Sequence, residues 1–293
     1  MPRPLLCSLL GLVIAAAAGC GSEPPAGAAP AEPTTPAPGN PTAFAPAACG
    51  TLTGLVTWVG PVPDVAPAAH IIPRTNGAGY DTRLIVPANA PRIDRFTRGL
   101  AGAVVFLREV ETARAKPWDL GKVEVELRDS QIAVRQDGRT GRTGFVLRGK
   151  EEKNKVLMQS AEPVFHVLRG RGAAFFALPF PEPDMPLART FDACGRVELS
   201  SAAGFYWQSA ELFVCDHPYY ALTDADGRFH FTQVPAGQYD LVAWHPNWVV
   251  ARTERNPESG LPSRLHYAPP LGSSRPVGVS AGRTTLANLT LPK

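Results

Sequence analysis

Three side chains of this sequence, His166, Cys215 and His217, are of the types that bind transition metals through nitrogen and sulfur. Cys215 and His217 are two residues apart, so on a strand they would project from one face. A blue-copper centre needs two imidazoles and a thiolate in a trigonal arrangement. These residues could supply that set if the fold brought His166 to the other two, and we keep them as an alternative metal site.

Aromatic residues are the second group of candidates. Rings gather in 205–207 and again in 244–248, both near expected loop ends. Exposed rings beside Asn and His side chains can stack on sugars or contact a partner protein, whereas buried rings would fill the junction between two domains. The candidate ligand-binding residues are Tyr206, Trp207, Trp244 and Trp248.

Known catalytic patterns are absent from the sequence. It contains no G-x-S-x-G, no H-E-x-x-H, no P-loop and no G-x-G-x-x-G opening a helix. Its net charge of +3 is small and dispersed, without a basic run, which argues against nucleic-acid binding. We therefore expect a protein that is not an enzyme and that has no cofactor.

The amino terminus predicts export. Arg3 precedes an apolar run from Leu5 to Gly19, which at 15 residues is shorter than the ~20 that a spanning helix needs. The run ends in Ala-Ala-Gly-Cys and resembles the lipobox of bacterial lipoproteins, with Ala17 where that family usually has Leu. The resemblance implies a signal peptide over 1–19 and acylation of Cys20.

Residues 20–48 are expected to form a tether, because 21–48 hold eight Pro and nine Ala in 28 positions and cannot build a core. The predicted location is the bacterial cell envelope, in the periplasm or at the outer membrane, with the lipid on Cys20 as the membrane contact. Export also permits disulfides. Cys49, Cys194 and Cys215 allow at most one bridge, and the pairing stays open.

The rest of the chain has the pattern of β-strands. Residues 122–128 alternate between polar and apolar side chains, as in a strand with one buried face. Residues 103–107 are continuously apolar, which suits a strand buried on both faces. Frequent Gly, Pro and Asp between such runs indicates an all-β fold.

The segment 222–245 contains a T-x-x-D-G-x-F turn followed by V-P-x-G-x-Y, here Thr223 to Phe229 and Val234 to Tyr239. This segment resembles the carboxypeptidase regulatory-like family, which has a transthyretin-like (prealbumin-like) β-sandwich. The family's opening strand is matched far upstream at Gly54-Leu55-Val56. We therefore expect a split sandwich over 49–64 plus 210–293, interrupted by a domain over 65–209.

The expected insertion resembles a cupredoxin-like Greek-key β-sandwich. Residues 160–166, 204–210 and 217–220 run parallel to the family's three motifs. With Trp207 on the motif's Trp, Ala202 stands at the Cys ligand, Phe205 at the second His and Gln208 at the Met. We therefore expect a domain that lacks the copper ligands and binds no stoichiometric copper.

The function predicted from these features is a non-enzymatic envelope lipoprotein with a binding or structural role, its partner being an unknown protein or glycan. The alternative is a periplasmic electron-transfer protein with a non-standard copper site.

Replacing the proposed lipid-bearing residue tests the anchor. Cys20→Ala should move the protein from the membrane fraction to the soluble fraction or stall its processing, measured by fractionation and immunoblotting. Cys7→Ala, in the signal peptide, serves as the control. Unchanged membrane partition of Cys20→Ala would contradict the anchor.

Overall fold

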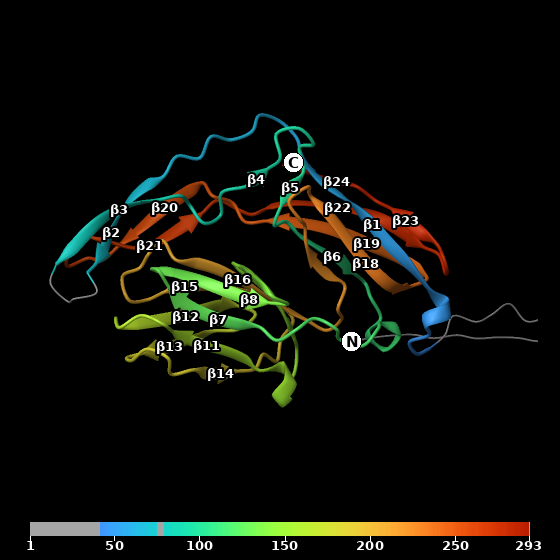
Figure 1. Ribbon diagram of the computed structural model, residues 1–293, viewed down its shortest axis with the longest axis horizontal. Helices are drawn as coiled ribbons and strands as arrows, with labels where there is room; N and C mark the ends of the chain where they lie inside the picture. Colours follow the sequence, from blue (N-terminus) through green and yellow to red (C-terminus); the bar gives the residue numbers. More distant parts are fainter. Residues whose placement is uncertain (1–41, 75–78, 293) are drawn as a thin grey trace, which may run out of the picture. The chain divides into compact units, whose positions relative to one another are not determined.

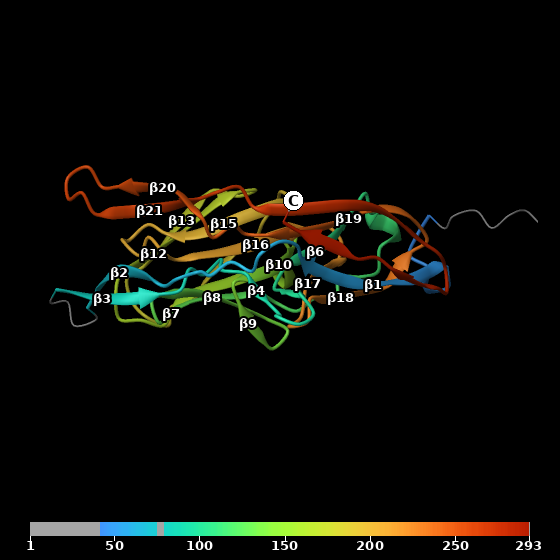
Figure 2. The same ribbon diagram turned by 90° about the horizontal axis from the view of Figure 1, so that it is seen from above.

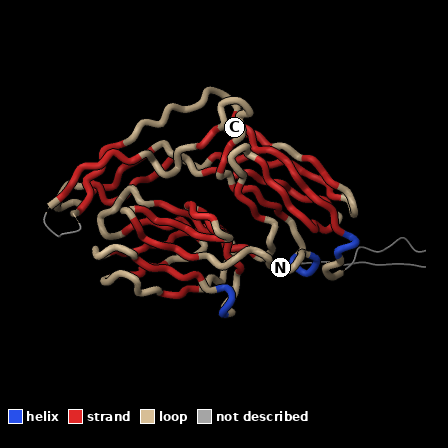
Figure 3. The backbone as a smooth tube through the Cα atoms, in the orientation of Figure 1, coloured by secondary structure: helices blue, strands red, loops and turns tan. Residues whose placement is uncertain are grey.

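The computed structural model describes residues 42–74 and 79–292, which belong to one compact unit of the chain. The signal peptide, Cys20 and most of the predicted tether lie outside the described residues. Strands dominate (Figure 3), and the helical segments of the described part are short 3-10 turns at Pro46–Ala48, Thr112–Arg114 and Glu152–Asn154. None of its helices is long and apolar enough to span a membrane. The all-β prediction is confirmed.

The first of two β-sandwiches, here named the split sandwich, contains the ends of the described chain (Figure 1). In one sheet, β1 (Cys49–Trp58) pairs antiparallel with β18 (Arg228–Pro235) and parallel with β23 (Thr284–Leu286) and β24 (Leu289–Leu291). The other sheet has the order β17 (Tyr220–Leu222), β6 (Val104–Arg108), β19 (Gly237–His245) and β22 (Leu271–Val279). Inward residues of both sheets, including Leu52, Val56, Leu107, Leu241 and Phe229, form a shared core.

The second sandwich, here named the inserted sandwich, is built from β7 to β16. One sheet has the order β10 (Thr143–Leu147), β16 (Ser209–Cys215), β15 (Gly195–Ser201), β12 (His166–Gly172) and β13 (Phe176–Phe180). The other has the order β14 (Leu187–Arg189), β11 (Val156–Ser160), β7 (Glu124–Arg128), β8 (Gln131–Gln136) and β9 (Arg139–Gly141). Its own core includes Val125, Met158, Leu168, Leu199 and Leu212.

The expected domain boundaries are wrong at both ends of the insertion. Strand β6 lies in the range 65–209, yet it pairs with β17 and β19 of the split sandwich. Strand β16 falls largely in 210–293, yet it pairs with β10 and β15 of the inserted sandwich. The chain leaves the split sandwich after β6 and returns at β17, the strand hydrogen-bonded to β6. The insertion therefore interrupts a strand pair.

An apolar junction cluster, made of Val104, Phe145, Phe213 and Cys215 with surrounding half-buried rings, joins the two sandwiches. Phe213 lies edge-on to Trp244 at a centroid distance of 5.2 Å, and Phe106 stacks on Tyr220 at 5.1 Å. The junction accounts for the continuous apolar run in β6. In β6, Val105 and Leu107 enter the core of the split sandwich, whereas Val104 faces the junction.

Two hairpins leave the split sandwich and extend over the inserted one (Figure 2). One is formed by β2 (Ala68–Pro73) and β3 (Tyr80–Ile85), the other by β20 (Val250–Arg255) and β21 (Pro262–Tyr267). A shorter pair, β4 (Arg92–Ile93) and β5 (Leu100–Ala101), precedes β6. Ile72 of β2 packs with Phe205 and Trp207, so the first hairpin closes one end of the inserted sandwich.

The turn before β18 has the geometry that its sequence predicts. Asp224 Oδ1 accepts hydrogen bonds from the backbone N–H groups of Asp226 and Arg228, at 3.0 and 2.8 Å. Gly227 has φ +80°, and a Cβ atom there would lie 2.5 Å from the carbonyl oxygen of Val56 and 2.8 Å from the Cα atom of Gly99. Glycine is therefore required by both the backbone conformation and the close approach of three segments.

A matched pair of glycine substitutions separates these two effects. Gly227→Ala should lower the free energy of unfolding by about 1–3 kcal/mol more than Gly282→Ala, because overpacking adds to the strain of a positive φ. Gly282 has φ +66° with open space around it. Urea denaturation of both variants gives the comparison, and equal losses would show that the close approach has no energetic effect.

Candidate functional site

His166 of the alternative metal set is fully buried. It begins β12, at the end of the inserted sandwich that the first hairpin covers. Its Nε2 atom lies 2.8 Å from Oε2 of Glu162, and its ring lies 4.4 Å from that of Phe205. The motif comparison placed Phe205 at the position of a second histidine ligand. The fold does bring the two positions together, but an apolar ring packs against the imidazole.

Cys215 and His217 lie away from His166. Ser209 and Cys215 mark the two ends of β16, about 20 Å apart at ~3.3 Å per residue. The register of β12, β15 and β16 puts His166 near the Ser209 end. His217 packs on the rings of Tyr219 and Tyr220. Within 42–74 and 79–292, no group of three or more His, Cys, Asp or Glu residues could hold a metal ion, and the alternative set does not converge.

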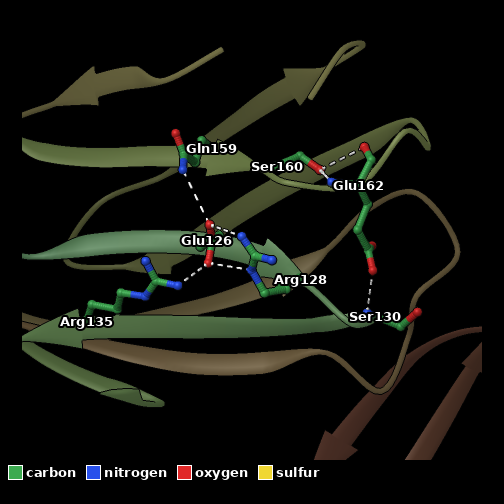
Figure 4. Close-up of polar contacts among 7 residues, drawn as sticks. All are labelled: Glu126, Arg128, Ser130, Arg135, Gln159, Ser160 and Glu162. Atoms are coloured by element: carbon green, nitrogen blue, oxygen red, sulfur yellow. Dashed lines mark hydrogen bonds and ion pairs between the residues drawn. The ribbon is translucent and has the colours of Figure 1, made fainter. Parts of the chain in front are cut away.

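Glu162 is instead part of a structural network. Its Oε1 atom accepts a 2.8 Å hydrogen bond from the backbone N–H of Ser130 (Figure 4), and the indole of Trp207 donates to the Ser130 carbonyl oxygen at 2.9 Å. Burial raises the pKa of Glu162, but the hydrogen bonds from His166 and Ser130 outweigh it and leave the pKa below its ordinary value.

The four aromatic candidates have different environments. Trp207 is 3% exposed, so its prediction as a ligand contact is wrong. Trp248 is half-buried against Trp58, with centroids 5.8 Å apart. Trp244 belongs to the junction, between Phe213 and the guanidinium of Arg196. Tyr206 is half-buried and lines a hollow.

This hollow, here named the hairpin groove, has a volume of about 380 Å³. It lies between the two hairpins and the 202–206 loop. The Tyr206 ring is held edge-on to Trp207, at a centroid distance of 5.1 Å, and 5.3 Å from the ring of His70. The other residues on which its chemistry depends are Tyr80, Arg169, Glu254, Asn256 and Arg264. The groove thus combines fixed aromatic surface with planar hydrogen-bonding side chains.

A second hollow of about 240 Å³, here named the charged cavity, lies beneath the second hairpin and shares Arg264 with the groove. Glu198 of β15 and Glu211 of β16 are direct cross-strand partners, an arrangement that is destabilising for like charges. Each has an arginine partner: Arg264 Nη2 donates to Glu198 Oε1 at 2.7 Å, and Arg196 Nη1 donates to Glu211 Oε1 at 3.2 Å.

Glu211 is the ionisable group of the cavity with the largest change in pKa. The residue is 6% exposed, and its Oε2 atom has no hydrogen-bond partner in the described part of the chain. Burial, opposed by Arg196 and assisted by Glu198, raises the pKa of Glu211 to about 8. At neutral pH its carboxyl group is therefore mostly protonated and has an O–H to donate.

Glu126 of β7 shows the contrasting case of a buried glutamate that stays ionised (Figure 4). Arg128 donates to both of its carboxylate oxygens, at 2.9 and 3.0 Å, and Arg135 adds a bond of 2.7 Å. These arginines, with Arg128 the main cause, lower the pKa of Glu126 although burial raises it. Its arginine partners account for its burial in a strand where strict alternation predicts an exposed residue.

Arg142 adds a half-buried cation beside the cavity. It donates to the backbone oxygen of Ser209 and to the side chain of Gln131. Burial lowers its pKa to about 10, while Tyr267, which lines the cavity, acts in the opposite direction. A hollow of about 660 Å³ lies farther along the junction, but Arg92, Arg139 and Asp224 on its wall are exposed. The charged cavity therefore holds the more strongly perturbed groups.

Known proteins give partial matches to this chain. Residues 217–258 match the family described as the BOS complex subunit NOMO1-like, second beta sandwich domain. No curated protein sequence matches the chain. The match supports a β-sandwich in this part of the chain, while the carboxypeptidase regulatory-like family stays a resemblance. A β-sandwich of the matched type is compatible with a non-catalytic binding or structural role.

Solved structures similar to the chain include several forms of amicyanin. An oxidised proline-to-glycine mutant is 15% identical, covering 32% of this chain and 83% of its own, with a TM-score of 0.23. A Cu(I) methionine-to-glutamine mutant and a reduced tryptophan-to-tyrosine mutant are each 14% identical, covering 38% of this chain and 98% of their own. Their TM-scores are 0.24 and 0.25.

The raised pKa of Glu211 predicts a pH dependence of stability. The carboxyl group of the unfolded chain ionises near the ordinary glutamate pKa of 4.5, and that of the folded chain near 8. The folded state therefore binds more protons between these values, and its extra stability is complete below pH 4.5 and lost as pH rises through 8. Between pH 6.5 and 8 the free energy of unfolding should fall by up to about 1.4 kcal/mol per pH unit.

Glu211→Gln should remove this slope, because the amide cannot ionise. Urea denaturation at pH 6.5 and pH 8 measures it, with Glu126→Gln as the control that should keep it. Burial lowers the pKa values of His70, His217 and His245 below the unfolded value of 6.5, so near pH 6.5 these residues add a slope of opposite sign, which the wild-type and variant proteins share. Equal slopes in the wild-type and Glu211→Gln proteins would contradict a raised pKa at Glu211.

Proposed function

We propose that the chain is an exported, lipid-anchored, non-enzymatic protein of the bacterial envelope that binds a carbohydrate in the hairpin groove. The observation that carries this proposal is the combination of tyrosine rings and planar polar side chains around one hollow of about 380 Å³. Sugar rings present apolar C–H faces and a rim of hydroxyl groups. Aromatic faces fit the former, and convergent hydrogen-bonding groups fit the latter.

The aromatic part of the groove is set before a ligand arrives. The contacts of Tyr206 with Trp207 and His70 fix its ring, so little rotamer entropy remains to be lost on binding. Tyr80 is 62% exposed and lines the same hollow. Tyr206 belongs to the inserted sandwich and Tyr80 to the first hairpin, and a ligand spanning them would contact both.

One polar side chain of the groove, Arg264, is held in place by a carboxylate of the charged cavity. Arg264 is held by Glu198 at 2.7 Å, and its side chain is 13% exposed. Arg169, also on the groove, projects from β12. Arginine, asparagine and carboxylate groups form paired hydrogen bonds with fixed geometry, which suits adjacent hydroxyl groups of a sugar.

The proposed location at the bacterial cell envelope suits a carbohydrate-binding domain. The 25 residues 21–45 that precede the first 3-10 turn would reach on the order of 80 Å in polyproline conformation, at ~3.1 Å per residue. A binding domain at that distance from a lipidated Cys20 could contact polymers beside the membrane. The structure argues against the alternative of electron transfer through copper, because Cys215 and His217 lie at and beyond the end of β16 that is remote from His166.

Binding to an oligosaccharide array, followed by titration calorimetry of the best binder, tests the proposal. Tyr206→Ala and Tyr80→Ala should each weaken binding about tenfold, since an aromatic contact contributes roughly 0.5–1.5 kcal/mol beyond its area. Tyr80→Ala alters an exposed ring and should leave the fold intact. Phe175→Ala is the matched control, because Phe175 is 77% exposed and does not line the groove.

Two results would contradict this function. One is the absence of binding to any oligosaccharide on the array. The other is binding that Tyr206→Ala and Tyr80→Ala affect no more than Phe175→Ala does.

A further inference from the structure

The three cysteines of the described chain are unbridged in the structure, and two of them, Cys194 and Cys215, lie next to the terminal residue pair of β15 and β16. In the antiparallel pairing of β15 with β16, Gly195 is opposite Val214. Cys194 precedes Gly195 and Cys215 follows Val214, so the next position of the same register brings the cysteines together. Directly opposite residues of antiparallel strands have Cα atoms about 4.5–5.5 Å apart, and disulfides need about 4.4–6.8 Å.

Extending the alternation of β15 by one residue, through Gly195 with its φ of +133°, puts both cysteines on the same face. Val197 and Leu212 are paired and enter the inserted-sandwich core, whereas the neighbouring pair, Arg196 and Phe213, faces the junction. Side chains alternate along a strand. Cys194 is two residues from Arg196, and Cys215, itself a member of the junction cluster, is two residues from Phe213.

The two thiols differ in access. Cys215 is 1% exposed and donates a hydrogen bond to the carbonyl oxygen of Phe213, at 3.1 Å. Cys194 is exposed. Burial raises the pKa of both thiols, and Asp216, beside Cys215 in the chain, raises that of Cys194 further. Cys49 lies on β1 of the split sandwich and donates to the carbonyl oxygen of Ala45, outside this pair.

We propose that Cys194 and Cys215 form a disulfide bridge in the mature protein and that Cys49 stays a thiol. The proposed bridge depends on the export that is part of the proposed function, because export brings the protein to an oxidising compartment.

The oxidant is a disulfide-carrying thiol–disulfide exchange protein. The exposed Cys194 thiolate attacks its disulfide and forms a mixed disulfide, releasing one thiol of the oxidant. The Cys215 thiolate then attacks the Cys194 sulfur, and the second oxidant thiol leaves. The two cysteine thiols thus lose two electrons and two protons, and the oxidant disulfide becomes a dithiol.

Trypsin offers a direct readout, since Arg196 separates the two cysteines. Digestion without reduction should give residues 190–196 linked to residues 197–228, at a mass 2 Da below the sum of the two peptides. The link should be present in the mature wild-type protein and in Cys49→Ser, and absent from Cys194→Ser. Thiol titration in denaturant should find one thiol per mature chain, because Cys20 carries the lipid. Reduction should lower the Tm by about 5–10 °C.

Incubation of the reduced mature protein in a glutathione redox buffer tests this pairing separately from the proposed export. In the mature chain, where Cys7 is removed and Cys20 carries the lipid, three free thiols after that incubation, or a bridge that includes Cys49, would overturn the pairing. A bridge that forms in the buffer but is missing from protein isolated from cells would support the pairing and contradict the exported address.

Discussion

The hydrogen-bonded pair of β6 and β17 is the constraint on which the remaining structure depends. Tyr220, Ala221 and Leu222 pair with Phe106, Val105 and Val104, so the chain leaves and re-enters the split sandwich at adjacent strands. An insertion of this length adds little closure entropy, since that cost grows only logarithmically. The neighbouring junction cluster then holds the inserted sandwich against the sheet that it interrupts, which places its 202–206 loop beneath the two hairpins.

Electrostatics gives three glutamates of the inserted sandwich two different states, with the pKa lowered for Glu126 and Glu162 and raised for Glu211. Glu126 is surrounded by arginines and stays ionised, and Glu162 is held by His166 and a backbone amide. Glu211 faces another glutamate across the strands and has one arginine partner. Its unpartnered oxygen lies in a cavity that shares Arg264 with the groove. The first two residues stabilise the inserted sandwich, whereas Glu211 retains hydrogen-bonding capacity beside the proposed binding surface.

Much of the local structure could be predicted from sequence because it depends on neighbouring residues. The turn at Asp224 to Gly227 requires a side-chain acceptor and a residue that tolerates a positive φ. The sequence shows an Asp and a Gly at these two positions. The boundaries of the insertion were not predictable in this way. A continuous apolar run such as 103–107 indicates two buried faces but does not say which sheets cover them. Trp207 likewise adjoins an expected loop, and its burial involves Ile72 of the first hairpin, which is distant in the sequence.

The charged cavity could not be found from sequence, since the opposition of Glu198 and Glu211 exists only once β15 and β16 adopt their register. In the sequence, each is one acid on an alternating strand. A crystal structure with a bound oligosaccharide would show whether the two hairpins and the 202–206 loop form one binding surface. We expect the sugar between the hairpins, with one ring face on Tyr206. A sugar bound instead in the 660 Å³ hollow at Arg92 and Arg139, with the hairpin groove empty, would contradict it.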